Sequence, residues 1–207
     1  MVNFKLFVEG GGNHNRSLSV MCREGFRKFI QKSGYSGSMP KIVACGGRQI
    51  AYEKFQNESQ LGNVAFLLVD SEELVDETNW EKPWAHLAAR EGDNWQKPEN
   101  AEDNYCHLMV ICMESWFLAD RTALKAFFGQ GFNEKALPAG ETPLESIPKD
   151  KIYSSLEKAS HNCKTKKVYG KSEHSFKLLG LIDPGKVTAA SKWAKRFVNE
   201  LKVRNNA

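Results

Sequence analysis

Two hydrophobic periodicities alternate along the first two thirds of the chain. Short apolar runs, typical of β-strands, occur at 4–8, 41–45, 64–69 and 107–113. Stretches with apolar residues at helical spacing occur at 17–32, 48–56, 84–90 and 115–128. Strands and helices that alternate in this way form right-handed crossovers. The pattern therefore predicts an α/β fold, a Rossmann-like and mostly parallel sheet flanked by helices.

The rest of the chain predicts a helical extension. Residues 130–149 are rich in Gly, Pro and charged residues, which is typical of a linker or a long loop. Helical patterns follow at 151–160, 174–182 and 191–203. We therefore divide the chain into an α/β core (1–129), a linker or long loop (130–149) and a helical extension packed on the core (150–207).

Charge is unevenly distributed over these parts. The chain has 29 Lys and Arg against 25 Asp and Glu, a formal net charge of +4. Residues 149–207 carry 14 of these basic residues against 5 acidic ones, whereas residues 1–148 carry 15 against 20. An acidic body with a basic tail suits a protein that holds cations in one place and a polyanion beside them. The alternative is that the basic helices only solubilise the extension.

The composition excludes several classes of protein. With 41% hydrophobic and 26% charged residues, the chain is an ordinary globular protein. Its apolar runs fall short of the ~18 residues that a membrane span needs. The first residues read as a strand and not as a signal peptide. The five cysteines include no C-x-x-C pair, which argues against a zinc ribbon or a redox pair. We expect a cytoplasmic protein with no membrane partner.

Acidic residues stand where three of the four predicted strands end. Glu9 follows the first strand, Asp70 and Glu72 follow the third, and Glu114 follows the fourth. Parallel strands place their carboxyl ends at one edge of the sheet, where ligands bind. Carboxylates gathered there repel one another unless a cation joins them, and hard oxygen ligands suit Mg²⁺ or Mn²⁺. A single acid would more simply cap a helix, but the set predicts a metal site.

The glycines at 10–12 do not form a nucleotide-binding motif. They lack the Gly-x-Gly-x-x-Gly spacing, no Walker lysine follows them, and Glu9 would repel a pyrophosphate. Glycines at this place fit better with a metal or a substrate phosphate that approaches the backbone closely.

The strand ends Val8-Glu9-Gly10 and Val69-Asp70-Ser71-Glu72 resemble the TOPRIM fold. That fold is shared by topoisomerases, primases and the nucleases of the overcoming-lysogenization-defect type. The segments MESWFLAD (113–120) and KSEHSFKLL (171–179) resemble bacterial TOPRIM-like families that are often encoded next to ATPases in phage-defence loci. The resemblance thus covers most of the chain.

The resemblance implies roles for individual residues. Glu9 matches the first-motif glutamate, a metal ligand or general acid/base, and Asp70 and Glu72 match the Asp-x-Asp motif with Glu in its second position. Nucleases of this group often carry a second acid four residues after the first glutamate, where this chain has Asn13. We assign Glu114 as a further ligand that supplies the missing charge. The implied cofactor is Mg²⁺ or Mn²⁺.

A basic cluster in the extension suggests a nucleic-acid surface. Lysines interleaved with an aromatic residue suit phosphate contacts and base stacking, although a solvated loop would have the same composition. We assign Lys171 and His174 as catalytic residues beside Glu9, because a cation there would stabilise the charge that develops on a phosphorane. Arg48 begins the helix that follows the second strand, so we expect it at the carboxyl edge of the sheet, where it would meet a phosphate. The expected nucleic-acid-binding residues are Arg48, Lys164, Lys166, Lys167, Tyr169 and Lys171.

These observations predict a metal-dependent phosphodiesterase, a nuclease acting on DNA or RNA. The resemblance adds an ATPase partner and an antiviral role. Two other classes stay open. One is a non-catalytic adaptor that binds nucleic acid or a protein, which Asn13 and Glu72 favour. The other is a nucleotide phosphohydrolase or transferase. One or two metals, and a monomer or a homo-oligomer, are all compatible with the sequence.

Overall fold

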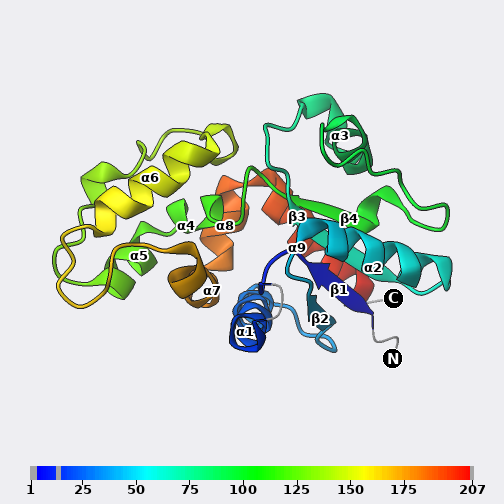
Figure 1. Cartoon of the computed structure of the whole chain (residues 1–207), viewed down its shortest axis with the longest axis horizontal. Helices are drawn as coiled ribbons and strands as arrows, with labels where there is room; N and C mark the ends of the chain where they lie inside the picture. Colours follow the sequence, from blue (N-terminus) through cyan, green and yellow to red (C-terminus); the bar gives the residue numbers. More distant parts are fainter. Residues whose placement is uncertain (1–3, 13–14, 206–207) are drawn as a thin grey trace.

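A four-stranded sheet lies at the centre of the molecule (Figure 1). The structure is a computed structural model that describes residues 4–12 and 15–205, so Asn13 lies outside the described residues. All strand pairs are parallel, in the order β2-β1-β3-β4. The strands are β1 (Lys5–Val8), β2 (Lys41–Ala44), β3 (Ala65–Asp70) and β4 (Cys106–Met109). The predicted α/β class with a parallel sheet is confirmed.

Two crossover helices connect the first three strands. Helix α1 (Arg16–Lys32) joins β1 to β2, and α2 (Arg48–Gln60) joins β2 to β3. Val8 pairs with Leu68 across the β1–β3 ladder, so the chain beyond both strands emerges at the same edge. Every residue of β3 is buried, as expected for an apolar strand with helices on both faces. This arrangement brings the residues that follow β1 and β3 side by side.

The polar segment between β3 and β4 is pinned to α2 by aromatic side chains. It contains the 3₁₀ turn η1 (Glu77–Asn79), helix α3 (Pro83–Ala89) and the turn η2 (Asp103–Tyr105). The ring of Trp95 stacks on Tyr52 of α2 at 4.6 Å between centroids, and Trp84 packs against Phe55. A sequence that is polar overall therefore forms an ordered layer packed against α2.

The region after β4 differs from the prediction. The expected strand at 107–113 ends at Met109, and the expected helix at 115–128 divides into α4 (Ser115–Leu118) and α5 (Arg121–Phe128). Asp120 separates the two helices, because its carboxylate accepts hydrogen bonds from the backbone N–H groups of Ala123 and Asp183. A side chain that caps a new helix competes with continuation of the preceding one.

The C-terminal half packs directly on the sheet and its helices. It contains the turns η3 (Glu134–Ala136) and η4 (Leu144–Ser146) and the helices α6 (Lys149–Ser160), α7 (Lys171–Leu181), α8 (Pro184–Ala190) and α9 (Lys192–Asn205). The sequence analysis missed α8, although Asp183 and Pro184 form a recognisable N-terminal cap. Helix α7 crosses α1 so closely that a Cβ atom on Gly25 would lie 2.6 Å from the Phe176 carbonyl oxygen.

Helix α9 covers the sheet on the face opposite α2 (Figure 1). Its Arg196 donates to the Cys106 carbonyl oxygen at 2.7 Å, at the start of β4. One buried hydrophobic cluster includes residues from Phe4 to Leu201. Among the described residues, the helices are too short or too polar to cross a membrane.

Candidate metal centre

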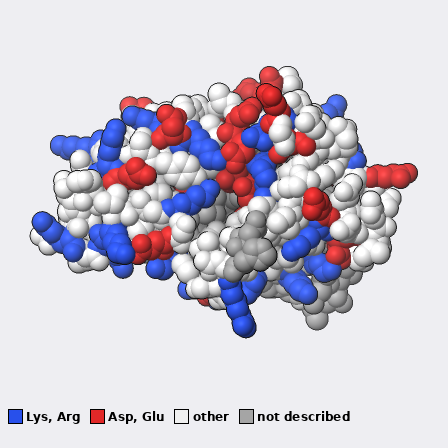
Figure 2. All heavy atoms as spheres, viewed as in Figure 1, with Lys and Arg blue, Asp and Glu red and all other residues white. Residues whose placement is uncertain are grey.

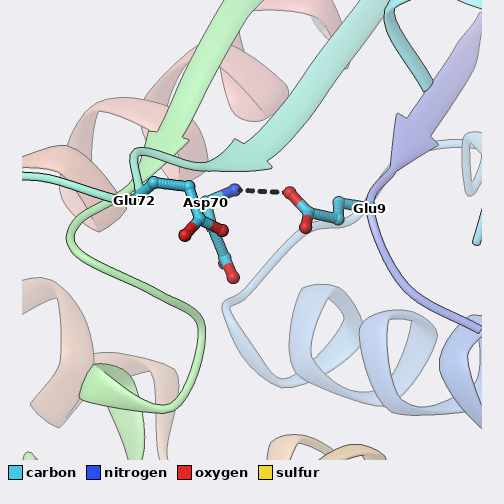
Figure 3. Close-up of side chains that lie close together, drawn as sticks. All are labelled: Glu9, Asp70 and Glu72. Atoms are coloured by element: carbon cyan, nitrogen blue, oxygen red, sulfur yellow. Dashed lines mark hydrogen bonds between the residues drawn. The ribbon is translucent and has the colours of Figure 1, made fainter. Parts of the chain in front are cut away.

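Three carboxylates meet at the carboxyl edge of the sheet. Glu9 follows β1, Asp70 ends β3, and Glu72 lies two residues further on. One carboxylate oxygen of each lies within 4.8 Å of the others (Figure 3). The backbone N–H of Asp70 donates to Oε2 of Glu9 at 3.2 Å, which ties the ends of the two strands together. We call these three residues the acidic triad.

Asp70 is the buried member of the acidic triad, with only 3% of its surface exposed. Its Oδ1 accepts a hydrogen bond from the Met113 N–H at 2.8 Å, and its Oδ2 has no hydrogen-bond partner among the described residues. Burial, reinforced by the charges of Glu9 and Glu114, raises the pKa of Asp70 well above its ordinary value. A bound cation would reverse this preference, because it stabilises the ionised carboxylate.

Glu9 shares this environment. Burial is the largest influence and raises the pKa of its carboxyl group. The nearby positive charge of Arg48 opposes that rise, while the negative charge of Glu72 adds to it. Two carboxyl groups with raised pKa values side by side are typical of a site built to hold a cation or a proton.

Glu72 reaches the acidic triad through an uncommon backbone conformation. Its φ is +67°, in the left-handed region that residues other than glycine rarely adopt. Its N–H donates to the Ile111 carbonyl oxygen at 2.9 Å, which fixes the turn after β3. The Glu72 carboxylate forms an ion pair with Lys149 of α6 and lies 3.7 Å from Nη1 of Arg48.

Arg48 lies at this edge, as the sequence predicted, but among carboxylates. Its Nη1 donates to the Asp70 carbonyl oxygen at 2.7 Å and to Oε2 of Glu9 at 3.4 Å. Its other nitrogens contact Asp93, an acid that the sequence analysis did not single out. Asp93 lies far from the strand ends in the sequence, so strand-end reasoning gave no signal for it.

A cavity of about 200 Å³ opens beside Glu9 and Asp70. Glu114 and the glycines at 10–12 form further parts of its wall, and Lys171, Ser172, Ser175 and Phe176 face it from α7. Figure 2 shows acidic atoms gathered near the middle of this face, next to Lys and Arg atoms. The cavity thus combines carboxylates from the sheet edge with a cation from the C-terminal half.

Lys171 is the predicted catalytic cation that the structure brings to Glu9 and Asp70. Although burial opposes it, the charges of Glu114, Asp70 and Glu9 raise the pKa of Lys171. The ammonium group therefore stays protonated. Gly10 and Gly11 line the same cavity, and a side chain at either position would clash, because its Cβ atom would lie 2.9 Å from Phe176 or from Ala44.

Glu114 lines the same cavity but lies outside the acidic triad. The side chain is fully buried and accepts three hydrogen bonds: from Ser175 at 2.9 Å, from Tyr153 at 3.0 Å and from Tyr169 at 3.3 Å. Tyr169 was expected to stack on bases, but the structure does not present it at the surface. Its ring is buried and its hydroxyl group is committed to Glu114.

His174 was expected to act beside Glu9, and the structure places it elsewhere. It lies on the buried side of α7 against the rings of Phe127 and Phe128 of α5. Its Nδ1 accepts a hydrogen bond from the Gly170 N–H at 3.0 Å. It does not line the cavity. The helix turns this residue towards the core, so a packing role accounts for it.

The remaining basic cluster does not reach the cavity either. Lys164, Lys166 and Lys167 are exposed on the loop between α6 and α7. Nζ of Lys166 lies 5.2 Å from the ring centroid of Phe127 in α5. Figure 1 shows this loop at the end of the molecule away from α2. Of the cluster, Lys171 is the member that lines the cavity.

A family model described as "Domain of unknown function (DUF4276)" matches residues 8–202. The chain belongs to the DUF4276 family. No curated protein and no solved structure matches it. The matched range begins one residue before Glu9 and extends into α9, so the DUF4276 domain includes both the acidic triad and the α7 residues that face it.

Proposed function

We propose that this DUF4276 protein is a Mg²⁺- or Mn²⁺-dependent phosphodiesterase, and more narrowly a nuclease. The observation that carries the proposal is the acidic triad. Three carboxylate oxygens within 4.8 Å of one another lie at the carboxyl edge of a parallel sheet, where ligands bind in this class of fold.

The residues of the triad fit a hard divalent cation. Mg²⁺ and Mn²⁺ prefer carboxylate oxygens, and Asp70 is a buried residue whose Oδ1 accepts one backbone hydrogen bond, from Met113. Burying an ionised carboxylate is costly unless a cation compensates for it. When bound, such ions activate water and stabilise the leaving oxygen of a phosphodiester.

The chain's own residues supply the rest of the site. Lys171 presents a protonated ammonium group that binds the phosphate oxygens of a substrate and stabilises added negative charge. Ser172 lines the cavity next to it and offers a hydrogen-bond donor. The glycines at 10–12 let a phosphate group approach the backbone closely. Together these groups favour an anionic ester over a neutral substrate.

The narrower assignment rests on the resemblance of the sequence to TOPRIM proteins. The order of acids after β1 and β3 supports a TOPRIM-like fold, and that fold supports a nuclease on DNA or RNA. An ATPase partner, an antiviral role, a cytoplasmic location and a homo-oligomeric state belong to the proposal on the same ground. They await tests of their own.

Metal binding and cleavage test the proposal together. We expect calorimetry to detect Mn²⁺ binding by the wild type and none by Asp70→Asn, which keeps the shape of the side chain. Cleavage of single-stranded DNA, duplex DNA and RNA should then depend on Mn²⁺ or Mg²⁺ and fall at least a hundredfold in Lys171→Met. A wild type that binds no Mn²⁺, or an Asp70→Asn variant that binds it equally well, would overturn the proposal.

One observation favours a second candidate, a non-catalytic adaptor. Glu72 is already paired with Lys149 and lies near Arg48, so two of the protein's own cations occupy positions around the triad. An adaptor would bind nucleic acid or a protein partner without divalent metal. Binding in EDTA that is unchanged in Asp70→Asn, with no cleavage by the wild type, would support the adaptor.

A further inference from the structure

Asp93 holds Arg48 from the side opposite to the acidic triad. Its side chain is only 2% exposed, although it lies on a loop between α3 and β4. The two side chains make a two-pronged contact: Nε of Arg48 donates to Oδ1 at 2.9 Å and Nη2 donates to Oδ2 at 2.5 Å. Arg90 adds a third contact to Oδ2 at 3.1 Å. Charge-assisted pairs of this geometry are among the strongest polar contacts in proteins.

This contact leaves one nitrogen of Arg48 for the acidic triad. Nη1 makes all three contacts on that side, with the Asp70 carbonyl oxygen, with Glu9 at 3.4 Å and with Glu72 at 3.7 Å. The guanidinium group therefore links the ends of β1 and β3 while most of its hydrogen-bonding capacity faces Asp93. Because Asp93 balances the positive charge, Arg48 does not cancel the negative charge of the triad.

The loop that carries Asp93 is built to hold it in place. Trp95 stacks on Tyr52 of α2, and its indole N–H donates to Gln49 at 2.8 Å. The same ring lies under the guanidinium group of Arg48, 5.0 Å from ring centroid to Cζ. Arg48 is thus fixed by an acid and an aromatic ring from one loop, which restricts both its position and its direction.

We propose that Asp93 is a positioning residue that acts through Arg48 on the acidic triad. By holding the guanidinium group of Arg48 and balancing its positive charge, Asp93 keeps the triad negative enough to bind a divalent cation. The inference rests on the proposed metal-dependent function. In this proposal, the polar segment between β3 and β4 serves to place a buried acid beside the edge of the sheet.

Mn²⁺ affinity measured by calorimetry tests this inference without any activity assay. Asp93→Asn leaves an unbalanced positive charge beside the triad, so we expect about tenfold weaker Mn²⁺ binding. The double variant Arg48→Gln/Asp93→Asn removes one charge of each sign, and we expect it to regain most of the lost affinity. Asp103→Asn is the matched control, because Asp103 lies on the same segment but pairs with Lys97 at 3.1 Å.

The outcomes separate this inference from the proposed function. Unchanged Mn²⁺ affinity in Asp93→Asn, or a double variant as weak as Asp93→Asn, overturns the inference alone. A wild type that binds no Mn²⁺ overturns both. If Asp93→Asn does not fold, Arg48→Lys takes its place, because Lys keeps the positive charge but cannot form the two-pronged contact by which Asp93 balances it. Wild-type affinity in Arg48→Lys would then overturn the inference.

Discussion

Lys149, the first residue of α6, forms an ion pair with Glu72, which lies 77 residues earlier in the chain. The C-terminal half thus places a positive charge on the acidic triad. Glu72 cannot give both of its oxygens to a metal while this pair persists. A divalent cation that binds all three carboxylates has to compete with Lys149.

We therefore expect Lys149→Met to strengthen Mn²⁺ binding by about three- to tenfold. The substitution keeps an unbranched side chain of similar length and removes the competing charge, and a partly buried pair of this kind is worth on the order of 1 kcal/mol. Calorimetric titration measures the effect. Lys151→Met is the control, since Lys151 is exposed on the same helix. Weaker binding in Lys149→Met would mean that Lys149 supports the metal site.

The buried charge of Asp70 is expected to lower the stability of the metal-free protein, although metal binding requires that charge. Because its pKa is raised, the folded state disfavours the ionised form that a metal needs. Asn would keep the hydrogen bond from the Met113 N–H without the charge. We expect Asp70→Asn to be more stable than the wild type at pH 8 in EDTA, by about 1 kcal/mol or more.

Urea unfolding with and without Mn²⁺ measures both effects of the Asp70 charge. Mn²⁺ should stabilise the wild type, because a ligand that binds only the folded state raises the free energy of unfolding. It should have no effect on Asp70→Asn. A variant that is less stable than the wild type in EDTA would contradict the prediction.

Glu114 is expected to behave as a structural anion whose loss weakens the fold. Its carboxylate accepts hydrogen bonds from three hydroxyl groups on α6, on α7 and before α7, and so joins these elements to the start of α4. Tyr153→Phe removes one bond to it and should cost about 1 kcal/mol, whereas Glu114→Ala leaves buried hydroxyl groups unpaired and should cost about 3 kcal/mol.

The same residue was predicted from the sequence as a metal ligand, and Glu114→Gln separates the two roles. Gln keeps an oxygen acceptor, so we expect its Mn²⁺ affinity to stay within threefold of the wild type. Loss of Mn²⁺ binding in a variant that unfolds at the same urea concentration as the wild type would show that Glu114 ligates the metal.

The sequence located the acidic triad because strand ends can be recognised locally. A few neighbouring residues are enough to recognise an apolar run that is followed by an acid. Parallel pairing of the strands then places these acids at one edge of the sheet. The same reasoning found Arg48 at the head of α2. Lys171 was singled out within a cluster of lysines, and its place in the cavity agrees with the catalytic role predicted for it and not with a basic surface.

The charged residues around the triad could not be found in the same way. Asp93 contacts Arg48 from a loop, Lys149 contacts Glu72 from the first turn of a distant helix, and nothing in their local sequence marks them. The side of a helix that faces a site is also set by tertiary packing. His174 stands three residues after Lys171, yet α7 turns it towards α5.

A buried histidine predicts how stability depends on pH. His107 of β4 is fully buried between the rings of Phe66 and Phe197, and its Nδ1 accepts a hydrogen bond from Arg196 at 3.2 Å. Its Nε2 has no partner among the described residues. Burial, reinforced by the charge of Arg196, lowers the pKa of His107 well below its ordinary value.

The unfolded chain therefore takes up a proton at His107 below pH ~6.5, whereas the folded protein does not. Since the unfolded state binds more protons, its free energy falls relative to the folded state as the pH drops. Whereas the raised pKa values of Asp70 and Glu9 favour the folded state as the pH drops, we expect the contribution of His107 to the free energy of unfolding to be constant above pH ~6.5 and to fall by up to about 1.4 kcal/mol per pH unit below it. His174, whose pKa burial also lowers, adds to the loss in the same direction.

Urea unfolding at pH 5 and pH 7 measures this loss, and His107→Phe should reduce it. Phe fills the same apolar site between Phe66 and Phe197 and cannot take up a proton in either state. His161→Phe, which changes an exposed histidine, should leave the pH dependence as it is in the wild type. If His107→Phe and the wild type lose equal stability between pH 7 and pH 5, protonation of His107 does not drive the acid sensitivity of the fold.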